Sequence, residues 1–535
     1  MSVDSSGDMN AELDARRVLG PGRGGPFGPV RPRRTSAPSR VSGAASEAAS
    51  RVRLPGRAGS PGGAREEGVA MTGWTVLEAL GAGIAVLLLA WTLLLYVPFR
   101  WRPLGLYLFV PKMAAGAFSP FIATAGLLLA LVGVLRGSWS LAVPAALAAV
   151  GAAIVVVRLG RVRADLAAAL GPDWADRIPS QRRARMVGRW WRGRLPTARE
   201  PRLRQDVAFA AVPDSGRKLL CDLWQPPAGV PASGLAIVYL HSSAWYILDK
   251  DAGTRPLFRH LAAQGHLVVD VAYRLFPETD IPGMVADAKR AVAWLKHHAA
   301  ELEIRPDRIV LAGGSAGGHL ALLAAYAHDD PILTPVELGG SDPSVCAVVS
   351  LYGQADLAAH YDHTSQQKVC RPDDPQPDWD APPPQWMRRV FGPDAGRLGL
   401  QHMTVAGRLD WLVGGTPSEV PDRYARLSPI HHVHPGCPPT LLLHGRQDEM
   451  APVAAMRHLR QRLQQAGVPV TAMYLPHTDH AFDLLAPAWS PQARTAIHVL
   501  ERFLAALAAT DQRSAAQPIS GSPAERVALP QAPSV

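Results

Sequence analysis

Three long runs of apolar residues dominate the first third of the chain. Residues Ala79–Val97, Met113–Leu135 and Ser138–Val157 contain no charged side chain. Each run approaches the ~20 apolar residues that a helix needs to cross the hydrocarbon core of a bilayer. Buried helices of a soluble domain and a cleaved leader are weaker interpretations, because three such runs follow one another. The pattern therefore predicts a membrane region at residues 71–160 with three transmembrane helices.

Beyond Gln205 the pattern changes to short apolar runs that alternate with amphipathic ones. A turn at residues 213–216 separates the first two runs, which predicts an antiparallel hairpin. The alternation predicts an α/β domain at residues 205–510, with a mostly parallel sheet covered by helices on both faces. The expected strands are Val207–Val212, Lys218–Trp224, Leu235–Leu240, Leu267–Val271, Arg308–Ala312, Val345–Leu351, Thr440–Leu443 and Val470–Leu475. The expected helices are Leu257–Gln264, Met284–Ala300, His319–Ala327, Met456–Gln465 and Ala493–Ala508.

Four other segments break this pattern. Residues 1–70 are rich in Arg, Gly, Pro and Ser, and we expect them, like residues 511–535, to form disordered tails. Residues 161–204 form a basic linker, in which six arginines surround Trp190 and Trp191. That linker is either a membrane-surface contact or a solvated segment. Residues 354–436 are rich in Pro and Trp, and they predict either a cap inserted over the sheet or an irregular excursion.

Charge bears on orientation and on partners. The 535-residue chain has a net charge of +10, but its basic tail lacks interleaved aromatic residues, so no nucleic-acid partner is expected. The positive-inside rule favours a multi-pass membrane protein with a cytoplasmic catalytic domain. A start at Met71 rather than Met1 would strengthen that bias. The cations on the two sides are Arg100, Arg102, Lys112, Arg158, Arg161, Arg163 and Arg177 against Arg136, Arg57 and Arg65.

The cysteine pattern does not suggest a disulfide framework or a zinc site. Cys221, Cys346, Cys370 and Cys437 are scattered without a CxxC pair. His431, His432 and His434 lie close together, but no carboxylate or thiolate accompanies them at ligand spacing. We therefore expect neither a metal nor an organic cofactor.

The stretch Gly313–Gly317 (GGSAG) carries the strongest chemical signal. It follows a predicted strand and precedes a predicted helix, as in a nucleophile elbow, where glycines allow a sharp turn that exposes a serine hydroxyl. A small-residue turn that packs a helix against the sheet is the alternative. The strand–turn–helix context favours Ser315 as a catalytic nucleophile.

A serine nucleophile needs a base, and the base needs a carboxylate that orients it. Asp448 follows the strand Thr440–Leu443, and His480 follows the next strand. The chain order Ser, Asp, His is that of the α/β-hydrolase triad. His477 and Glu449 are the alternatives for the base and the carboxylate.

A hydrolase of this kind must also stabilise an oxyanion with backbone N–H groups. The loop His241–Trp245 follows a predicted central strand, so Ser242 and Ser243 are candidate donors. The third candidate is the N–H of Ala316, next to the nucleophile. Trp245 is a candidate wall of the substrate pocket.

Several ordered motifs between Leu235 and Ala509 resemble the α/β-hydrolase superfamily. The resemblance is to the branch of hormone-sensitive-lipase-like, BD-FAE-type and kynurenine-formamidase-like enzymes, and it covers about half the chain. It implies the triad Ser315, Asp448 and His480, and a bracing role for Tyr273 and Arg274. The matching stretches are HSSAW, DVAYRLFPE, GGSAGGHLA, LYG, ARLSPI, LLLHGRQDEMAPV and HTDHAF.

One departure concerns the oxyanion loop, where Ser242 and Ser243 stand in place of the family's glycines. The N–H donors survive that change if neither position needs a positive φ. We expect a membrane-anchored carboxylesterase or lipase that acts on small-molecule, lipid-derived esters. An amidase, arylformamidase or peptidase of the same fold, and an inactive membrane scaffold, remain open.

Overall fold

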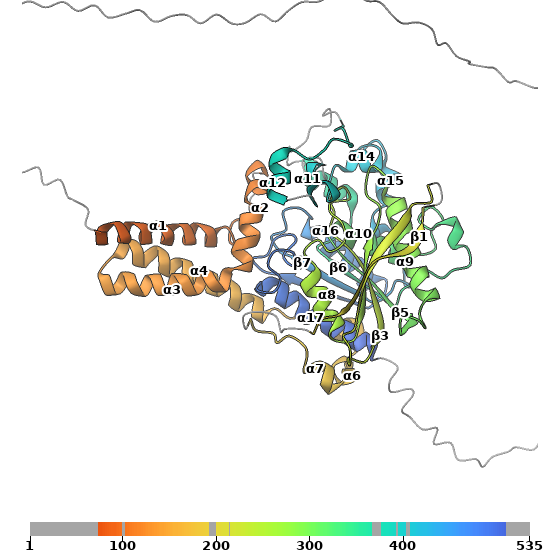
Figure 1. Cartoon of the computed structure of the whole chain (residues 1–535), viewed down its shortest axis with the longest axis horizontal. Coiled ribbons are helices and arrows are strands. Elements are labelled where there is room, and N and C mark those ends of the chain that lie inside the picture. The colour runs from red at the N-terminus through yellow and green to blue at the C-terminus, as the bar shows by residue number, and fades with distance from the viewer. Residues whose placement is uncertain are drawn as a thin grey trace, which may run out of the picture. The chain divides into compact units, whose positions relative to one another are not determined.

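The computed structural model describes residues 73–98, 102–191, 199–212, 215–365, 376–391, 394–402 and 407–509. The predicted tails, Cys370 and two of the linker arginines, Arg192 and Arg194, lie outside the described residues. The described part from Arg202 onward is built on an eight-stranded sheet with the order β1-β2-β4-β3-β5-β6-β7-β8 (Figure 1). This confirms the predicted α/β architecture.

The sheet begins with an antiparallel hairpin and continues as a parallel sheet. Strand β2 pairs antiparallel with both β1 and β4, and all later neighbours are parallel. The carboxyl ends of β3 and β5 to β8 therefore meet along one edge, where sites collect in such sheets. The strands are β1 (Arg202–Ala211), β2 (Lys218–Gln225), β3 (Gly234–Leu240), β4 (Leu267–Ala272), β5 (Ile304–Gly314), β6 (Ala347–Leu351), β7 (Thr440–Gly445) and β8 (Val470–Leu475).

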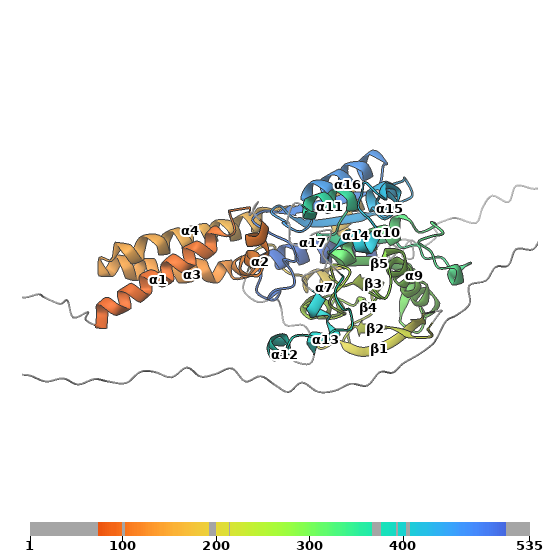
Figure 2. The ribbon, with the colours of Figure 1, turned by 90° about the horizontal axis from the view of Figure 1, so that it is seen from above.

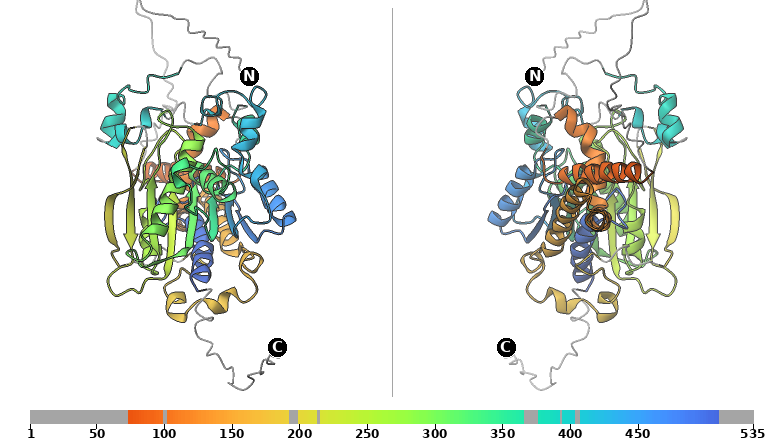
Figure 3. Two further views of the ribbon diagram at one scale, coloured as in Figure 1. Left: turned by 90° about the vertical axis from the view of Figure 1, so that its right-hand side faces the viewer. Right: turned by 90° about the vertical axis from the view of Figure 1, so that its left-hand side faces the viewer.

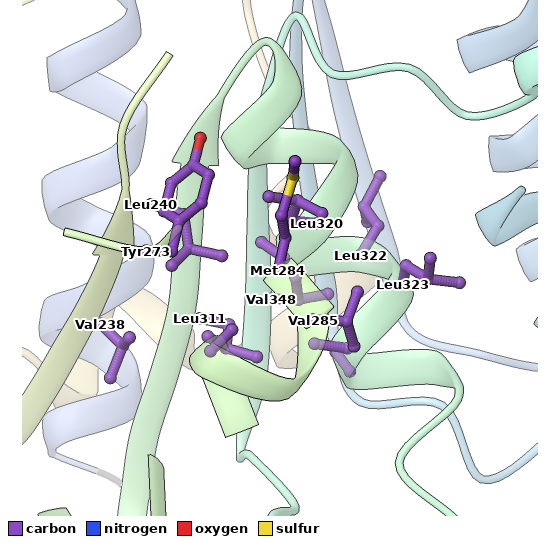
Figure 4. Close-up of a cluster of buried hydrophobic side chains, with 14 of the residues drawn as sticks. Val238, Leu240, Tyr273, Met284, Val285, Leu311, Leu320, Leu322, Leu323 and Val348 are labelled. Atoms are coloured by element: carbon purple, nitrogen blue, oxygen red, sulfur yellow. The ribbon is translucent and has the colours of Figure 1, made fainter. Parts of the chain in front are cut away.

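Helices cover both faces of the sheet (Figures 2 and 3). Alternate residues of β3 point to opposite faces, because side chains along a strand alternate. Val238 and Leu240 belong to the core shared with α9 and α10, whereas Ile237 and Tyr239 belong to the core shared with α8 and α17. Figure 4 shows part of the first core. The helices are α8 (Arg255–Ala262), α9 (Ile281–His297), α10 (Ala316–Tyr326), α16 (Val453–Gln465) and α17 (Pro491–Ala508).

Short helices make up the connections. Between β6 and β7, where a cap is predicted, the described chain contains short helices and turns. These are α11 (Leu357–Ser365), α12 (Gln385–Phe391), α13 (Asp394–Arg397), η2 (Leu400–His402), α14 (Leu409–Val413), α15 (Pro421–Arg426) and η3 (Pro429–His432). Elsewhere the short helices are α5 (Ala167–Leu170), α6 (Trp174–Arg177), α7 (Ser180–Arg183) and η1 (Val336–Leu338).

Three helices of the described residues are long and apolar enough to cross a membrane: α1 (Gly73–Leu93), α3 (Ser119–Arg136) and α4 (Trp139–Arg161). They lie side by side in Figures 1 and 2. The second predicted run is not one helix, because α2 (Arg102–Ala117) ends before Phe118 and α3 begins at Ser119. Pro120 sits in the first turn of α3, where its missing N–H is tolerated.

Small residues bring α3 and α4 close together. A Cβ atom on Gly133 would lie 2.6 Å from the backbone nitrogen of Ala142, and one on Gly126 would lie 2.7 Å from the carbonyl oxygen of Ala145. In lipid the hydrophobic effect does not drive helices together, so helices there associate through close packing of their backbones at small residues. The outward sides keep exposed leucines, among them Leu87, Leu127 and Leu135.

The chain just after α1, together with α2 and α4, packs against the α/β domain. Leu95 beyond α1, Ala115 of α2 and Val155 of α4 share one buried cluster with residues of α17. The basic segment also contacts α17, since the Val187 N–H donates to Glu501 Oε1 at 2.8 Å. The Trp191 indole N–H donates to the carbonyl oxygen of Trp489. The described part of this linker is therefore folded onto the domain.

Candidate active site

The turn around Ser315 is held by contacts that allow no side chain at Gly313 and Gly317. Ser315 lies between β5 and α10 with φ 53° and ψ −123°, a strained conformation for a non-glycine residue. A Cβ atom on Gly317 would lie 2.0 Å from the carbonyl oxygen of Leu240, and one on Gly313 would lie 2.4 Å from the Gly317 backbone. The sequence reason for GxSxG is thus the close approach of this turn to β3.

Ser315, His480 and Asp448 form a hydrogen-bonded chain. His480 Nε2 lies 2.8 Å from Ser315 Oγ, and His480 Nδ1 lies 2.9 Å from Asp448 Oδ2. All three side chains are buried. Since a carboxylate accepts, His480 Nδ1 carries the proton and Nε2 is free to accept from the serine hydroxyl. The structure brings together the three residues that the sequence predicted.

Asp448 is held as a carboxylate. Its Oδ1 accepts from the backbone N–H groups of Met450 and Ala451, and His444 Nε2 lies 3.2 Å from Oδ2. Burial alone would raise the pKa of Asp448, but His480 and His444 hold that pKa well below its usual value. The charge needed to orient and stabilise an imidazolium is therefore present at neutral pH.

The two alternatives from the sequence serve other contacts. His477 points its ring toward α1 and α4, since Nδ1 lies 3.1 Å from the carbonyl oxygen of Leu95 and Nε2 lies 3.0 Å from Arg158 Nη1. Burial lowers the pKa of His477, which keeps it neutral. The backbone N–H of Glu449 donates to Asp479 Oδ1. Neither His477 nor Glu449 belongs to the hydrogen-bonded chain of Ser315.

The backbone of the loop after β3 does not require glycine at Ser242 or Ser243. Positive φ angles fall on Ala244 (47°) and Trp245 (66°), and Ser242 and Ser243 are not among the positive-φ residues. Ser243 Oγ accepts from the Trp245 N–H and from Tyr273 Oη, so its hydroxyl braces the turn. The two serines therefore replace glycines without backbone strain at those positions.

The predicted oxyanion donors have unused N–H groups. Within the described part of the chain, the backbone N–H groups of Ser242, Ser243 and Ala316 donate to no protein acceptor. The Ala316 N–H opens α10, whose aligned peptide dipoles favour negative charge at this end. These three donors are available to a ligand oxygen.

Trp245, the predicted wall of the substrate pocket, is almost completely buried. It is 1% exposed, and its indole N–H donates to His319 Nδ1 at 3.3 Å. His319 Nε2 therefore carries the proton and donates to the carbonyl oxygen of Leu427. This geometry places Trp245 in a chain of contacts that runs from the loop after β3 through His319 of α10 to Leu427. A direct contact of Trp245 with substrate remains a prediction.

Aromatic residues join the segment between β6 and β7 to the loops that follow β3 and β4. Trp379 stacks on Tyr246 with ring centroids 5.9 Å apart, and it meets Phe276 edge-on at 5.4 Å. A cavity of about 700 Å³ lies near this cluster, but Asp206, Asp222 and Lys250 line it, and no triad residue does. Such a charged lining does not suit an apolar acyl group.

Two family models match the parts of the chain that carry Ser315, Asp448 and His480. Residues 221–376, which contain Ser315, match the model of the BD-FAE family. Residues 400–509, which contain Asp448 and His480, match the model of the prolyl oligopeptidase family. The two matches together span the three residues of the hydrogen-bonded chain.

The probable carboxylic ester hydrolase LipM of Mycobacterium tuberculosis is 32% identical over 385 residues, which cover 69% of this chain and 76% of LipM. The chain belongs to the carboxylic ester hydrolases of the α/β-hydrolase fold. Esterase LipQ of the same organism is 29% identical over 342 residues, 63% of this chain and 72% of LipQ. The LipM match is too long to lie wholly after Gln205, so it includes part of the preceding region.

Among solved structures, esterase 2 of Thermogutta terrifontis phosphonylated by sarin is similar to this esterase. The likeness has a TM-score of 0.41 and 22% sequence identity, and it covers 56% of this chain and 93% of that one.

Three residues next to Ser315, Asp448 and His480 were not predicted from the sequence. Asp479 Oδ1 accepts from the His480 N–H, Tyr352 donates its hydroxyl to Asp483, and the Tyr352 ring lies 4.7 Å from that of His480. The available signal was their place in the motifs, since Asp479 lies within HTDHAF, Tyr352 lies within LYG and Asp483 directly follows HTDHAF. Their hydrogen-bond partners depend on the tertiary fold and do not follow from the sequence.

Asp483 gives the esterase a testable pH dependence. Burial raises the pKa of Asp483 to about 6, so the folded state binds this proton more tightly than the unfolded state does. The free energy of unfolding should therefore fall as pH rises from about 4 to about 6, by roughly 2–3 kcal/mol. We expect Asp483→Asn to be more stable than wild type at pH 7.5 and to lose this advantage at pH 4. Thermal unfolding in detergent measures the difference, and an advantage of the same size at both pH values would contradict it.

Proposed function

We propose that this protein is a membrane-anchored serine hydrolase that cleaves carboxylic esters through an acyl-enzyme on Ser315. The observation that carries the proposal is the continuous chain from Ser315 Oγ through His480 to the Asp448 carboxylate, at 2.8 Å and 2.9 Å. Esterase relatives support the reaction class. The preference for a particular class of carboxylic ester is inferred from the chemistry of the site and from the apolar helices.

The reaction divides into two steps that use the same groups. Ser315 Oγ attacks the acyl carbon while His480 Nε2 takes its proton, and the imidazolium then protonates the departing alkoxide. A water molecule, deprotonated by His480, next attacks the acyl carbon. The bond from that carbon to Ser315 Oγ then breaks, the imidazolium returns its proton to Oγ, and the acid is released. Asp448 stays ionised and stabilises the imidazolium in each step.

The oxyanion of each tetrahedral intermediate would be bound by backbone donors. The unused N–H groups of Ser242, Ser243 and Ala316 support this assignment, and donors of this kind are worth about 3–4 kcal/mol each in transition-state stabilisation. All the steps proceed with the chain's own groups and water.

We assign residues 71–160 to a membrane region, 161–204 to a linker, and 205–510 to the hydrolase domain with a cap at 354–436. The three apolar helices and their exposed leucines support membrane anchoring. A cytoplasmic catalytic domain remains a prediction from flanking cations. One of these, Lys112, is buried against the hydrolase domain. Anchoring favours apolar, lipid-derived esters as substrates.

A second candidate is cleavage of C–N bonds by the same residues. The match of residues 400–509 to the prolyl oligopeptidase family favours it. Fold alone does not separate the two activities. Paired butyryl substrates, one an ester and one an anilide with the same leaving ring, would rank them by kcat/KM. An inactive scaffold is disfavoured, since the triad is connected and the oxyanion loop serines carry no positive φ.

Ser315→Ala tests the proposed nucleophile. We expect kcat for p-nitrophenyl butyrate to fall at least about a thousandfold, because no acyl-enzyme can form. Ser341→Ala, at an exposed serine after η1, is the matched control and should keep wild-type kcat. Activity retained in folded Ser315→Ala would refute the assignment.

Membrane anchoring has its own test. The full chain, expressed in bacteria, should remain in the membrane pellet after washing with alkaline carbonate and should need detergent for release. Spans of ~20 apolar residues bury too much surface to leave the bilayer in aqueous buffer. Release into the carbonate supernatant as folded, active enzyme would contradict the proposal.

A further inference from the structure

A lysine of α2 is buried beside the catalytic residues. Lys112 is 2% exposed, and its Nζ lies 2.7 Å from Asp479 Oδ2 and 3.8 Å from Glu449 Oε1. Asp479 precedes His480, and Glu449 follows Asp448. A cation from the membrane-associated region thus contacts both loops that supply the base and the carboxylate.

The Asp479 carboxylate connects these loops. Its Oδ1 accepts from the His480 N–H at 2.7 Å and from the Glu449 N–H at 2.9 Å. Its Oδ2 faces Lys112. One buried carboxylate therefore fixes the backbone of the histidine loop against the backbone of the aspartate loop, with Lys112 as its counter-charge.

The same histidine loop has a second attachment to the apolar helices. His477 contacts the carbonyl oxygen of Leu95 just beyond α1, and it contacts Arg158 in the last turn of α4. The ring of Tyr96 lies 4.6 Å from the His477 ring. The loop from His477 to His480 is thus held by α2 at one end and by α1 and α4 at the other.

Loss of the Lys112 charge would leave the buried Asp479 carboxylate without this counter-charge. The Asp479 side chain is 4% exposed, and a buried carboxylate without a counter-charge either takes up a proton or moves toward water. Either response disturbs the two N–H contacts that set the His480 backbone. A misplacement of about 1 Å can cost about a hundredfold in rate.

We propose that Lys112 is a positioning residue for His480, acting through Asp479, so that α2 completes the active site of the hydrolase domain. The inference rests on the proposed function of Ser315, Asp448 and His480. It assigns to the membrane-associated region a part in catalysis in addition to anchoring.

The test measures steady-state kinetics of Lys112→Met in the full-length, detergent-solubilised protein. We expect kcat per active site, counted by fluorophosphonate titration, to fall about 10- to 100-fold. We expect KM to change less than about twofold, because Lys112 does not contact substrate. Lys112→Arg keeps the charge and should restore most of kcat.

The matched control is Arg136→Met. Arg136 is also a cation of the apolar region and pairs with Glu78, but both side chains are about half exposed. It should keep wild-type kcat. Wild-type kcat in folded Lys112→Met would overturn the proposal, as would an equal loss in Arg136→Met.

The double variant Lys112→Met/Asp479→Asn removes both charges of the buried Lys112–Asp479 pair. The Glu449 carboxylate also loses its contact with Lys112, but its side chain is 21% exposed. We expect it to fold even if Lys112→Met does not, and to have a kcat at least about fivefold below wild type with KM unchanged. Where both fold, its kcat should exceed that of Lys112→Met, because the two sites are coupled. Wild-type kcat in the double variant would also overturn the proposal.

These outcomes distinguish failure of the proposed function from failure of the positioning role of Lys112. If Ser315→Ala keeps the activity of wild type, the proposed function fails and the positioning role fails with it. If wild type is active, Ser315→Ala is inactive and folded Lys112→Met equals wild type, only the role of Lys112 is lost.

Discussion

The backbone of Ser315 is the constraint on which the site depends. A non-glycine residue with φ 53° and ψ −123° is strained by roughly 1–3 kcal/mol, and the surrounding packing must hold it there. Gly317 lies against the carbonyl oxygen of Leu240, where even a methyl group would not fit. This contact presses the turn between β5 and α10 against the end of β3. It thereby brings the serine hydroxyl, the loop after β3 and the start of α10 to one edge of the sheet.

The other half of the site comes from strands further along the same sheet. Parallel pairing of β6, β7 and β8 places the Asp448 and His480 loops side by side beyond their carboxyl ends. Loops are ordinarily the softest parts of such a fold. Here Asp479 ties the two loops together, and Lys112 and Arg158 connect them to the apolar helices. The loops that carry Asp448 and His480 are therefore held in place by residues of α2 and α4.

Much of this could be predicted from the sequence. All eight strands were expected, because short apolar runs between amphipathic ones are typical of a covered parallel sheet, and Ser315, Asp448 and His480 followed from motif order. The break at Phe118 was missed, because an uncharged run does not show where a helix bends. Lys112 was counted as a membrane-flanking cation, since its partner Asp479 lies more than 360 residues away in the chain. Long-range pairing of this kind follows from tertiary contacts alone.

The most direct test of the account is covalent trapping of the nucleophile in the full-length protein. The detergent-solubilised enzyme is treated with a fluorophosphonate probe, and the modified peptide is mapped by mass spectrometry beside His480→Ala. The account predicts one adduct per chain, on Ser315, which forms far more slowly when His480 is replaced. Well-folded protein that takes up no probe, or that carries the adduct on another serine, would contradict it.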